Sequence, residues 1–256
     1  MMIHPTAIIQ SGAEIPDSCE IGPYCVIGSN VKMGPNTKLH SHVAIDGHTE
    51  LGSGNEIFPF ASIGLRTQDL KWQGGKTFTK IGDNNVIRES VTIHSATGEG
   101  EITSVGSNNN LLAYCHVAHN CQIGNNIIMS NSTGLAGHVV VEDFAVFGGM
   151  TGVHQFCRIG TLAMVGGCSR ISQDVCPYTL VNGNPPIPAG LNKIGIERKK
   201  ISSETQNVLK EAYKILFRSN LTVQKALDSM RNDLPKNPEI DHLVDFLEKS
   251  ERGICR

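Results

Sequence analysis

Four of the ten histidines fall within 39 residues of one another, at positions His116, His119, His138 and His154. Gly137 follows His119 by 18 residues, and Gln155 follows Gly137 by the same interval. Imidazole can act as a general base, taking a proton from a hydroxyl near neutral pH, and neutral imidazoles can also bind zinc. A fold whose repeat matches this interval would bring the set together.

The chain has such a repeat. Reading every sixth residue from Ile3 to Ile171 meets an apolar side chain at 26 of 29 positions, where 39% hydrophobic residues would give about 11 by chance. The exceptions are Asp69, Gly75 and Glu99. One inward aliphatic side chain per hexapeptide predicts a mainly β fold, a parallel β-helix with three short strands in each 18-residue coil. Known folds with this period are left-handed, against the usual crossover rule.

We expect residues 1–186 to form this β-helix and residues 187–256 to form an α-helical C-terminal domain. Two polar interruptions, near 64–80 and 95–104, keep the six-residue phase and therefore predict loops that leave the coil unbroken. Beyond them the spacing of apolar residues becomes helical, with Ser202 or Ser203 as an N-cap and further helices near 221–230 and 240–247. The helices are expected to cover the open end of the β-helix.

Stacking of the coils predicts where the histidines lie. His119, Gly137 and Gln155 should share one column, with His138 and His154 on the flanking columns of the same side. Counting in steps of 18 puts His94 on a different side. In a threefold oligomer that side can face a neighbour, so we expect His94 to join the site from another subunit.

Composition narrows the class of protein. The net charge of -2 combines -5 over residues 1–192 with +3 over residues 193–256, so the C-terminal part could bind an acidic partner. Eight cysteines without a C-x-x-C pair predict reduced thiols in the cytoplasm, and no apolar run is long enough for a membrane span. No nucleic-acid partner and no stable membrane insertion are expected.

Five cysteines occupy the small inward position of the repeat and should be buried fillers, namely Cys19, Cys25, Cys115, Cys121 and Cys157.

Six segments, in order along the chain, resemble the family of UDP-N-acetylglucosamine 3-O-acyltransferases that starts lipid A synthesis. The resemblance covers essentially the whole chain, including the final Arg-Gly-Ile, and six motifs in order are specific although each is weak alone. The segments are Gln68–Lys71, Ile87–His94, His116–Cys121, Leu135–His138, Val153–Cys157 and Met164–Cys168.

The resemblance implies that His119 takes the proton from the 3-hydroxyl of UDP-N-acetylglucosamine, which attacks the thioester of a (3R)-hydroxyacyl acyl carrier protein. The backbone N–H of Gly137 would stabilise the oxyanion. The family also implies a homotrimer with sites between subunits and no cofactor. The residues that match its substrate-binding positions are Gln68, Asp69, Lys71, His94, His116, His138, His154, Gln155, Asn192, Arg198 and Lys199.

Three residues depart from the family pattern. Asn120 follows His119 where Asp is usual, so it can orient the ring but brings no charge. Lys199 replaces an arginine and loses the bidentate fork. Pro185 replaces a histidine that limits acyl length, and Gly167, 18 positions earlier, is expected to stack with it at the end of the acyl groove.

Other functions fit the sequence less well. A zinc site here would resemble that of the hexapeptide-repeat carbonic anhydrases. Their H-x4-H spacing, however, is wider than the spacing between His116 and His119, so we predict no metal. A related N-acyltransferase for a 3-amino sugar nucleotide would suit Asn120, although those relatives carry an additional N-terminal uridine-binding domain. A structural or ice-binding solenoid would show outward threonine ladders, which this sequence lacks.

Overall fold

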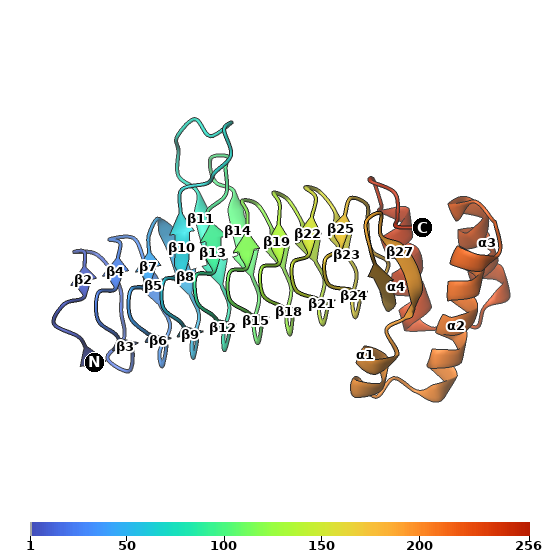
Figure 1. Ribbon diagram of the computed structural model, residues 1–256, viewed down its shortest axis with the longest axis horizontal. Helices are drawn as coiled ribbons and strands as arrows, with labels where there is room; N and C mark the ends of the chain where they lie inside the picture. Colours follow the sequence, from blue (N-terminus) through green and yellow to red (C-terminus); the bar gives the residue numbers. More distant parts are fainter. Residues whose placement is uncertain (1) are drawn as a thin grey trace.

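Short strands separated by tight corners run from Met2 to Ile171 and form the three sides of a parallel β-helix (Figure 1). The computed structural model describes residues 2–256. The first sheet holds β1 (Met2–Ile3), β3 (Glu20–Ile21), β6 (Lys38–Leu39), β9 (Glu56–Ile57), β12 (Val86–Ile87), β15 (Asn110–Leu111), β18 (Ile128–Met129), β21 (Val146–Phe147), β24 (Met164–Val165), β26 (Thr179–Asn182) and β27 (Ile187–Leu191).

The second sheet holds β2 (Ile8–Ile9), β4 (Val26–Ile27), β7 (Ala44–Ile45), β10 (Ser62–Leu65), β13 (Thr92–His94), β16 (His116–Val117), β19 (Gly134–Leu135), β22 (Gly152–Val153) and β25 (Arg170–Ile171). The third sheet holds β5 (Lys32–Met33), β8 (His48–Leu51), β11 (Phe78–Ile81), β14 (Ile102–Val105), β17 (Gln122–Ile123), β20 (Val140–Val141) and β23 (Arg158–Ile159). Strand pairs are parallel throughout, except that β27 runs antiparallel to β26.

Many corners are four-residue turns whose third residue has a positive φ. In one of them the N–H of Thr133 donates to the carbonyl of Ser130 at 3.2 Å, and Ser132 between them has φ 62°. This is the pattern of a type II turn, where the second residue uses no N–H and proline is tolerated. Proline fills this second position in several N-terminal coils, as Pro23, Pro35 and Pro59.

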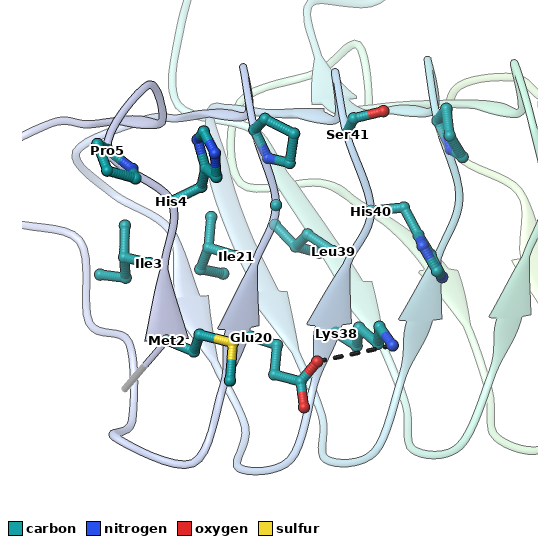
Figure 2. Close-up of a pocket in the computed structure, with 13 residues that line it drawn as sticks. Met2, Ile3, His4, Pro5, Glu20, Ile21, Lys38, Leu39, His40 and Ser41 are labelled. Atoms are coloured by element: carbon teal, nitrogen blue, oxygen red, sulfur yellow. Dashed lines mark ion pairs between the residues drawn. The ribbon is translucent and has the colours of Figure 1, made fainter.

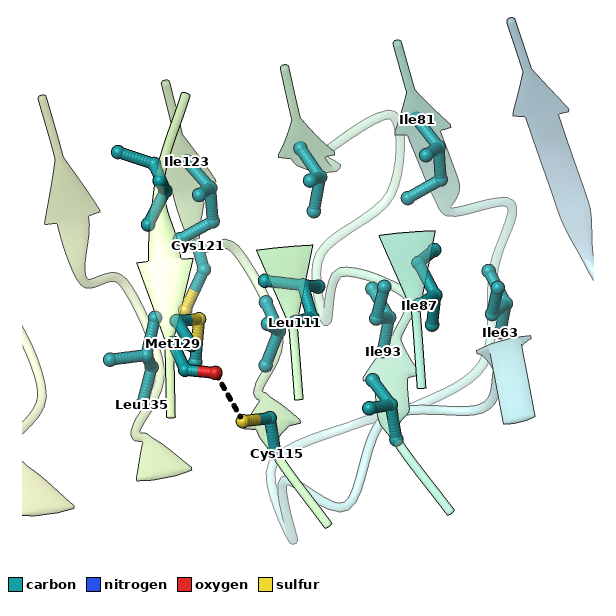
Figure 3. Close-up of a cluster of buried hydrophobic side chains, with 14 of the residues drawn as sticks. Ile63, Ile81, Ile87, Ile93, Leu111, Cys115, Cys121, Ile123, Met129 and Leu135 are labelled. Carbon is teal, nitrogen blue, oxygen red and sulfur yellow. Dashed lines mark hydrogen bonds between the residues drawn. The ribbon is translucent and has the colours of Figure 1, made fainter. Parts of the chain in front are cut away.

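The apolar residues of the six-residue period fill the interior, as Figure 3 shows for the middle coils. From Ile21 to Ile171 every apolar member of the series is buried, which confirms the predicted inward column. The five cysteines expected as fillers are also buried, and the thiol of Cys115 donates to the carbonyl of Ser130 at 3.2 Å. Burial of this apolar surface is the main source of stability.

Loops lengthen two coils without changing the phase. In an ordinary coil Val117 pairs with Leu135, whereas in the two lengthened coils Ile63 pairs with Ile93 and Ile93 pairs with Val117. Both longer spacings are still multiples of six, so the loops leave the inward column intact, as predicted. The loops connect β10 to β11 and β13 to β14, and they project together from one edge of the β-helix (Figure 1).

Four helices cover the C-terminal end of the β-helix: α1 (Lys193–Arg198), α2 (Ser203–Arg218), α3 (Val223–Asp233) and α4 (Pro238–Glu248). Ser202 is the N-cap of α2, as expected, because its hydroxyl accepts the N–H of Thr205 at 3.1 Å. The segment Ile187–Leu191 is not helical as predicted but forms β27, since it folds back along β26 in a hairpin. No helix among residues 2–256 is both long and apolar enough to span a bilayer.

Candidate active site

His119 is the second residue of the corner between β16 and β17, and its side chain is 15% exposed. Gly137 occupies the same place one coil later, and a Cβ atom there would lie within 3 Å of the ring atoms Cε1 and Nε2 of His119. Only glycine therefore leaves room for this ring position. The N–H of Gly137 donates no hydrogen bond within residues 2–256, as expected at the second position of a corner.

Asn120 orients the ring of His119. It has φ 61°, a conformation that asparagine tolerates well. Its Oδ1 lies 2.9 Å from His119 Nδ1 and 3.1 Å from the backbone N of Thr97. Because a backbone N–H only donates, the atom facing it is the amide oxygen, and these partners assign the proton to His119 Nδ1. His119 Nε2 then has a free lone pair.

The loops 66–77 and 95–101 lie beside this corner and are bonded to one another. The hydroxyls of Thr67 and Thr97 are 3.1 Å apart, and the N–H of Gly100 donates to the carbonyl of Lys76 at 2.8 Å. Each loop belongs to one of the two coils that precede the coil of His119. Their polar side chains are thus held over the histidine corner.

Asp69, from the first of these loops, has Oδ2 3.7 Å from His119 Nε2. A hydrogen bond from the N–H of Lys71, at 3.0 Å, and the nearby His119 hold the pKa of Asp69 below its ordinary value. The predicted residues Gln68 and Lys71 are exposed in the same loop. An anionic carboxylate therefore faces the nitrogen that can accept a proton.

His116 and His94 lie together on the second sheet. His116 Nδ1 is 2.7 Å from the hydroxyl of Thr92, and the rings of His94 and His116 meet edge-on with centroids 5.2 Å apart. Burial lowers the pKa of both, to about 4 for His94, so both are neutral at pH 7. The prediction that His94 lies on another side of the prism is wrong. The loop 95–101 adds one hexapeptide to that coil, which brings His94 beside His116 in the same chain.

The remaining predicted residues on this edge surround His119 on its C-terminal side. The ring of His138 lies edge-on to that of His119, with centroids 5.2 Å apart, and stacks on Phe156 at 4.7 Å. His154 and Gln155 are exposed in the following corner, where His154 Nδ1 lies 3.2 Å from the carbonyl of Gln155. The predicted columns are confirmed by the regular register of these coils, in which Gln122 pairs with Val140 and Gly134 with Gly152.

An open groove of about 450 Å³ runs across the second sheet beside His116 and His154. Its floor includes Gly134 and Gly152, where a Cβ atom would meet no atom within 4 Å. These outward glycines leave the surface bare, and the aliphatic Val153 and Ile171 also line it. The groove can hold a flexible apolar chain that ends near His119.

Gly167 and Pro185 do not stack as predicted. Met164 of β24 pairs with Leu180 of β26, which is two positions short of a full coil, and Pro185 lies in the turn of the β26–β27 hairpin. The last coil is shorter because the chain turns early at Asp174, whose N–H donates to the carbonyl of Gly253 at 2.8 Å. The C-terminal segment at Gly253 fills the space that a full 18-residue coil would occupy.

The predicted residues of the tail have different surroundings. Asn192 is buried, caps α1 through its Oδ1 and donates from Nδ2 to the carbonyl of Leu162 at 2.8 Å. Arg198 and Lys199 are exposed at the end of α1, and Lys199 Nζ lies 3.0 Å from the centroid of the Phe144 ring. The α1 terminus therefore presents two cations beside the last coils.

A separate hollow of about 570 Å³ lies on the first sheet across the N-terminal coils (Figure 2). Ile3, Ile21 and Leu39 line it, and Lys38 pairs with Glu20 at 3.6 Å on its wall. It lies several coils from His119. Among residues 2–256, no three His, Cys, Asp or Glu side chains gather closely enough to hold a metal ion.

Sequence reasoning missed two residues that fix the histidines. The hydroxyl of Thr92 is hydrogen-bonded to His116, and the outward position of Thr92 in the repeat could have indicated this contact. Thr97 acts through its backbone N–H, which depends on the loop conformation and leaves no mark in the sequence.

The C-terminal part is similar to a family described as Udp N-acetylglucosamine O-acyltransferase, domain 2, which matches residues 174–255. The curated acyl-[acyl-carrier-protein]--UDP-N-acetylglucosamine O-acyltransferase of Synechocystis sp. is 50% identical over 202 residues, covering 79% of this chain and 73% of the relative. The enzyme of the same name from Gloeothece citriformis has the same identity and coverage.

Solved structures are similar over the whole length. The UDP-N-acetylglucosamine O-acyltransferase of Moraxella catarrhalis is 46% identical with a TM-score of 0.97, and the match covers 100% of both chains. The UDP-N-acetylglucosamine acyltransferase of Francisella novicida is 40% identical with a TM-score of 0.94, covering 100% of this chain and 94% of the other. These solved structures thus contain both the β-helix and the C-terminal helical region.

Proposed function

The chain belongs to the UDP-N-acetylglucosamine O-acyltransferase family, the acyl carrier protein-dependent enzymes of lipid A biosynthesis, and on this premise we propose that His119 is its general base. His119 Nε2 takes the proton from the 3-hydroxyl of the sugar as that oxygen attacks the thioester carbonyl of a (3R)-hydroxyacyl acyl carrier protein. The observation that supports this role is the hydrogen bond from His119 Nδ1 to Asn120, which leaves Nε2 unprotonated.

The oxyanion of the tetrahedral intermediate is bound by the N–H of Gly137. This group has no acceptor within residues 2–256 and lies next to the ring of His119. A donor fixed in the backbone stabilises developing charge without reorganisation. Collapse of the intermediate expels the carrier thiolate, which takes up the proton held on His119.

The side chains around His119 divide between the two substrates. Asp69 faces Nε2, where it can accept a hydrogen bond from the sugar and stabilise the imidazolium that forms. Gln68 and Lys71 share its loop and are assigned to the sugar nucleotide. Arg198 and Lys199 of the tail lie away from this corner, at the end of α1, and are assigned to the sugar nucleotide from the family resemblance. The acyl chain lies in the groove beside His116 and His154, where each buried methylene contributes about 0.8 kcal/mol.

The active form is a homotrimer with sites between subunits. Support comes from the groove, which is open along the second sheet in one chain, and from exposed side chains such as Phe60, Tyr114 and Met150 on the corners that border this sheet. Light scattering should give about 83 kDa for three chains of 27.6 kDa. A monomeric, fully active enzyme would contradict this arrangement. All eight cysteines are free thiols, which suits a cytoplasmic location.

Asn120 also suits an enzyme that acylates a 3-amino sugar, so the acceptor atom needs its own test. Purified enzyme is given a mixed pool of hydroxyacyl carrier proteins with either UDP-N-acetylglucosamine or its 3-amino analogue, and the mass of the product is measured by mass spectrometry before and after mild alkali. An ester at the 3-position is expected and would be cleaved. Activity restricted to a 3-amino sugar, with an alkali-stable amide product, would replace the hydroxyl acceptor by an amine.

The base assignment is tested by His119→Ala. We expect kcat to fall at least about 100-fold, with KM for both substrates changed only slightly and the fold retained. His4→Ala, in the first coil, is the matched control and should behave as wild type. A folded His119→Ala enzyme with near-normal kcat would show that another group removes the proton.

A further inference from the structure

Glu101 is linked to His119 through Asn120. The carboxylate Oε2 of Glu101 lies 2.7 Å from Asn120 Nδ2, while Asn120 Oδ1 lies 2.9 Å from His119 Nδ1. The three side chains thus form one continuous row of hydrogen bonds. Glu101 comes from the end of the loop 95–101, just before β14, and not from the corner that carries His119.

The direction of every bond in this row is fixed by its partners. A carboxylate only accepts, so the Asn120 atom facing Glu101 is the NH₂ group. The N–H of Thr97 only donates, so the other end of the amide is the oxygen. Both partners therefore hold the amide in the same orientation, and that orientation requires a proton on His119 Nδ1.

Glu101 itself is held in place. Its Oε2 accepts the N–H of Gly98 at 2.8 Å, and its backbone is bonded to Gly98 and Phe78 at 3.0 Å each. A Cβ atom on Gly98 would lie 2.6 Å from the carboxyl carbon of Glu101, so glycine leaves the space that the carboxylate fills. The hydrogen bond from Asn120, the bond from Gly98 and the charges of His138 and His119 lower the pKa of Glu101. The carboxylate is ionised at neutral pH.

We propose that Glu101 is a positioning residue that acts through Asn120 to hold the productive tautomer of His119 and to stabilise its imidazolium form. The inference rests on the proposed role of His119 as the base. When Nε2 takes the proton of the sugar hydroxyl, both ring nitrogens carry protons and the ring becomes cationic. Asn120 transfers no proton but is polarised between this cation and the carboxylate, and Glu101 stays ionised throughout.

The pairing gives Asn120 and Glu101 a shared role. A carboxylate directly after His119 would supply the charge without an intermediary. Introducing it by Asn120→Asp while Glu101 remains would bring two carboxylates into contact, and like charges at this distance repel. Asn120→Asp should therefore retain acyl transfer only when Glu101 is replaced by a neutral side chain.

The experiment measures kcat, KM and the pH dependence of kcat/KM for Glu101→Gln, Asn120→Asp and the double variant. Glu101→Gln should lower kcat about 10-fold, leave KM within about 2-fold and move the acidic limb to lower pH. Asn120→Asp alone should also lose activity. The double variant should recover most of kcat and move the acidic limb back upward. Glu99→Gln is the matched control: Glu99 lies in the same loop, bonds the N–H of Lys76 and does not contact Asn120, so its pH profile should be that of wild type.

The outcomes separate this inference from the base assignment. A Glu101→Gln enzyme with wild-type kcat and pH profile, alongside an inactive His119→Ala, would overturn the role of Glu101 alone. If the two losses in kcat simply multiplied in the double variant, the role of Glu101 would also be overturned. Substitutions at residues that act as one unit have effects on the activation free energy that do not add. Normal activity in His119→Ala would instead remove the base itself.

Discussion

Replacing Gly137 by alanine should inactivate the enzyme by displacing the ring of His119. The new Cβ atom would lie within 3 Å of ring atoms Cε1 and Nε2, whereas ordinary contacts begin at 3.4 Å. The ring must therefore move by up to about 1 Å, and a displacement of that size at a reacting nitrogen costs about 100-fold in rate. The backbone N–H remains in Gly137→Ala, so the proposed oxyanion donor is retained and any loss of rate reports on the position of the ring.

The fold should tolerate this change. The φ of Gly137 lies outside the left-handed region, so alanine fits its backbone and even gains about 0.4–1 kcal/mol by restricting the unfolded chain. The assay is steady-state transfer from hydroxyacyl carrier protein to UDP-N-acetylglucosamine, with Tm measured alongside. Gly134→Ala, where the added methyl meets no atom, serves as the folding control. A Gly137→Ala enzyme with kcat within about 3-fold of wild type would refute the steric reasoning.

Three further predictions concern the tail, the groove and the buried histidine. Reversing the exposed charges of Lys210 and Lys214 on α2 should raise KM for the carrier substrate at low salt and have less effect at high salt; an unchanged KM at low salt would exclude this helix as the docking surface. Gly167→Met should shift preference to shorter donors by roughly 10- to 200-fold per methylene in a competition assay, and equal slowing of all donors would place the end of the groove elsewhere. Because the pKa of His94 is depressed to about 4 in the folded chain, the unfolded chain binds more protons between pH 6.5 and pH 4, and stability should fall by up to about 3 kcal/mol as the pH is lowered across that window. Denaturant titrations of His94→Asn should show a shallower fall, and an identical slope would mean that His94 does not titrate as described.

The sequence predicted the coil well because its determinants are local and repeated. Each inward aliphatic, from Ile21 to Ile171, occupies the same environment, so one period describes all of them. The column of His119 and Gly137 followed from the same arithmetic, since no loop interrupts those coils.

Positions that depend on loops or ends could not be predicted this way. His94 was misplaced because a loop of unknown extent alters the coil length, and the period alone cannot distinguish an ordinary coil from one that is a hexapeptide longer. Gly167 and Pro185 were misplaced because the C-terminal segment closes the last coil at Asp174, a contact between residues far apart in the chain. Glu101 gave no signal because its role depends on the fold of its loop.

Chemical rescue of His119→Gly is the experiment that tests most directly whether His119 is the general base. Removing the ring leaves a space beside Gly137, and small imidazoles of graded basicity are added while acyl transfer is measured. If His119 acts as the general base, the variant is inactive alone, and added imidazoles restore transfer at a rate that rises with their basicity. Near wild-type transfer without imidazole, or rescue that does not depend on basicity, would contradict the account.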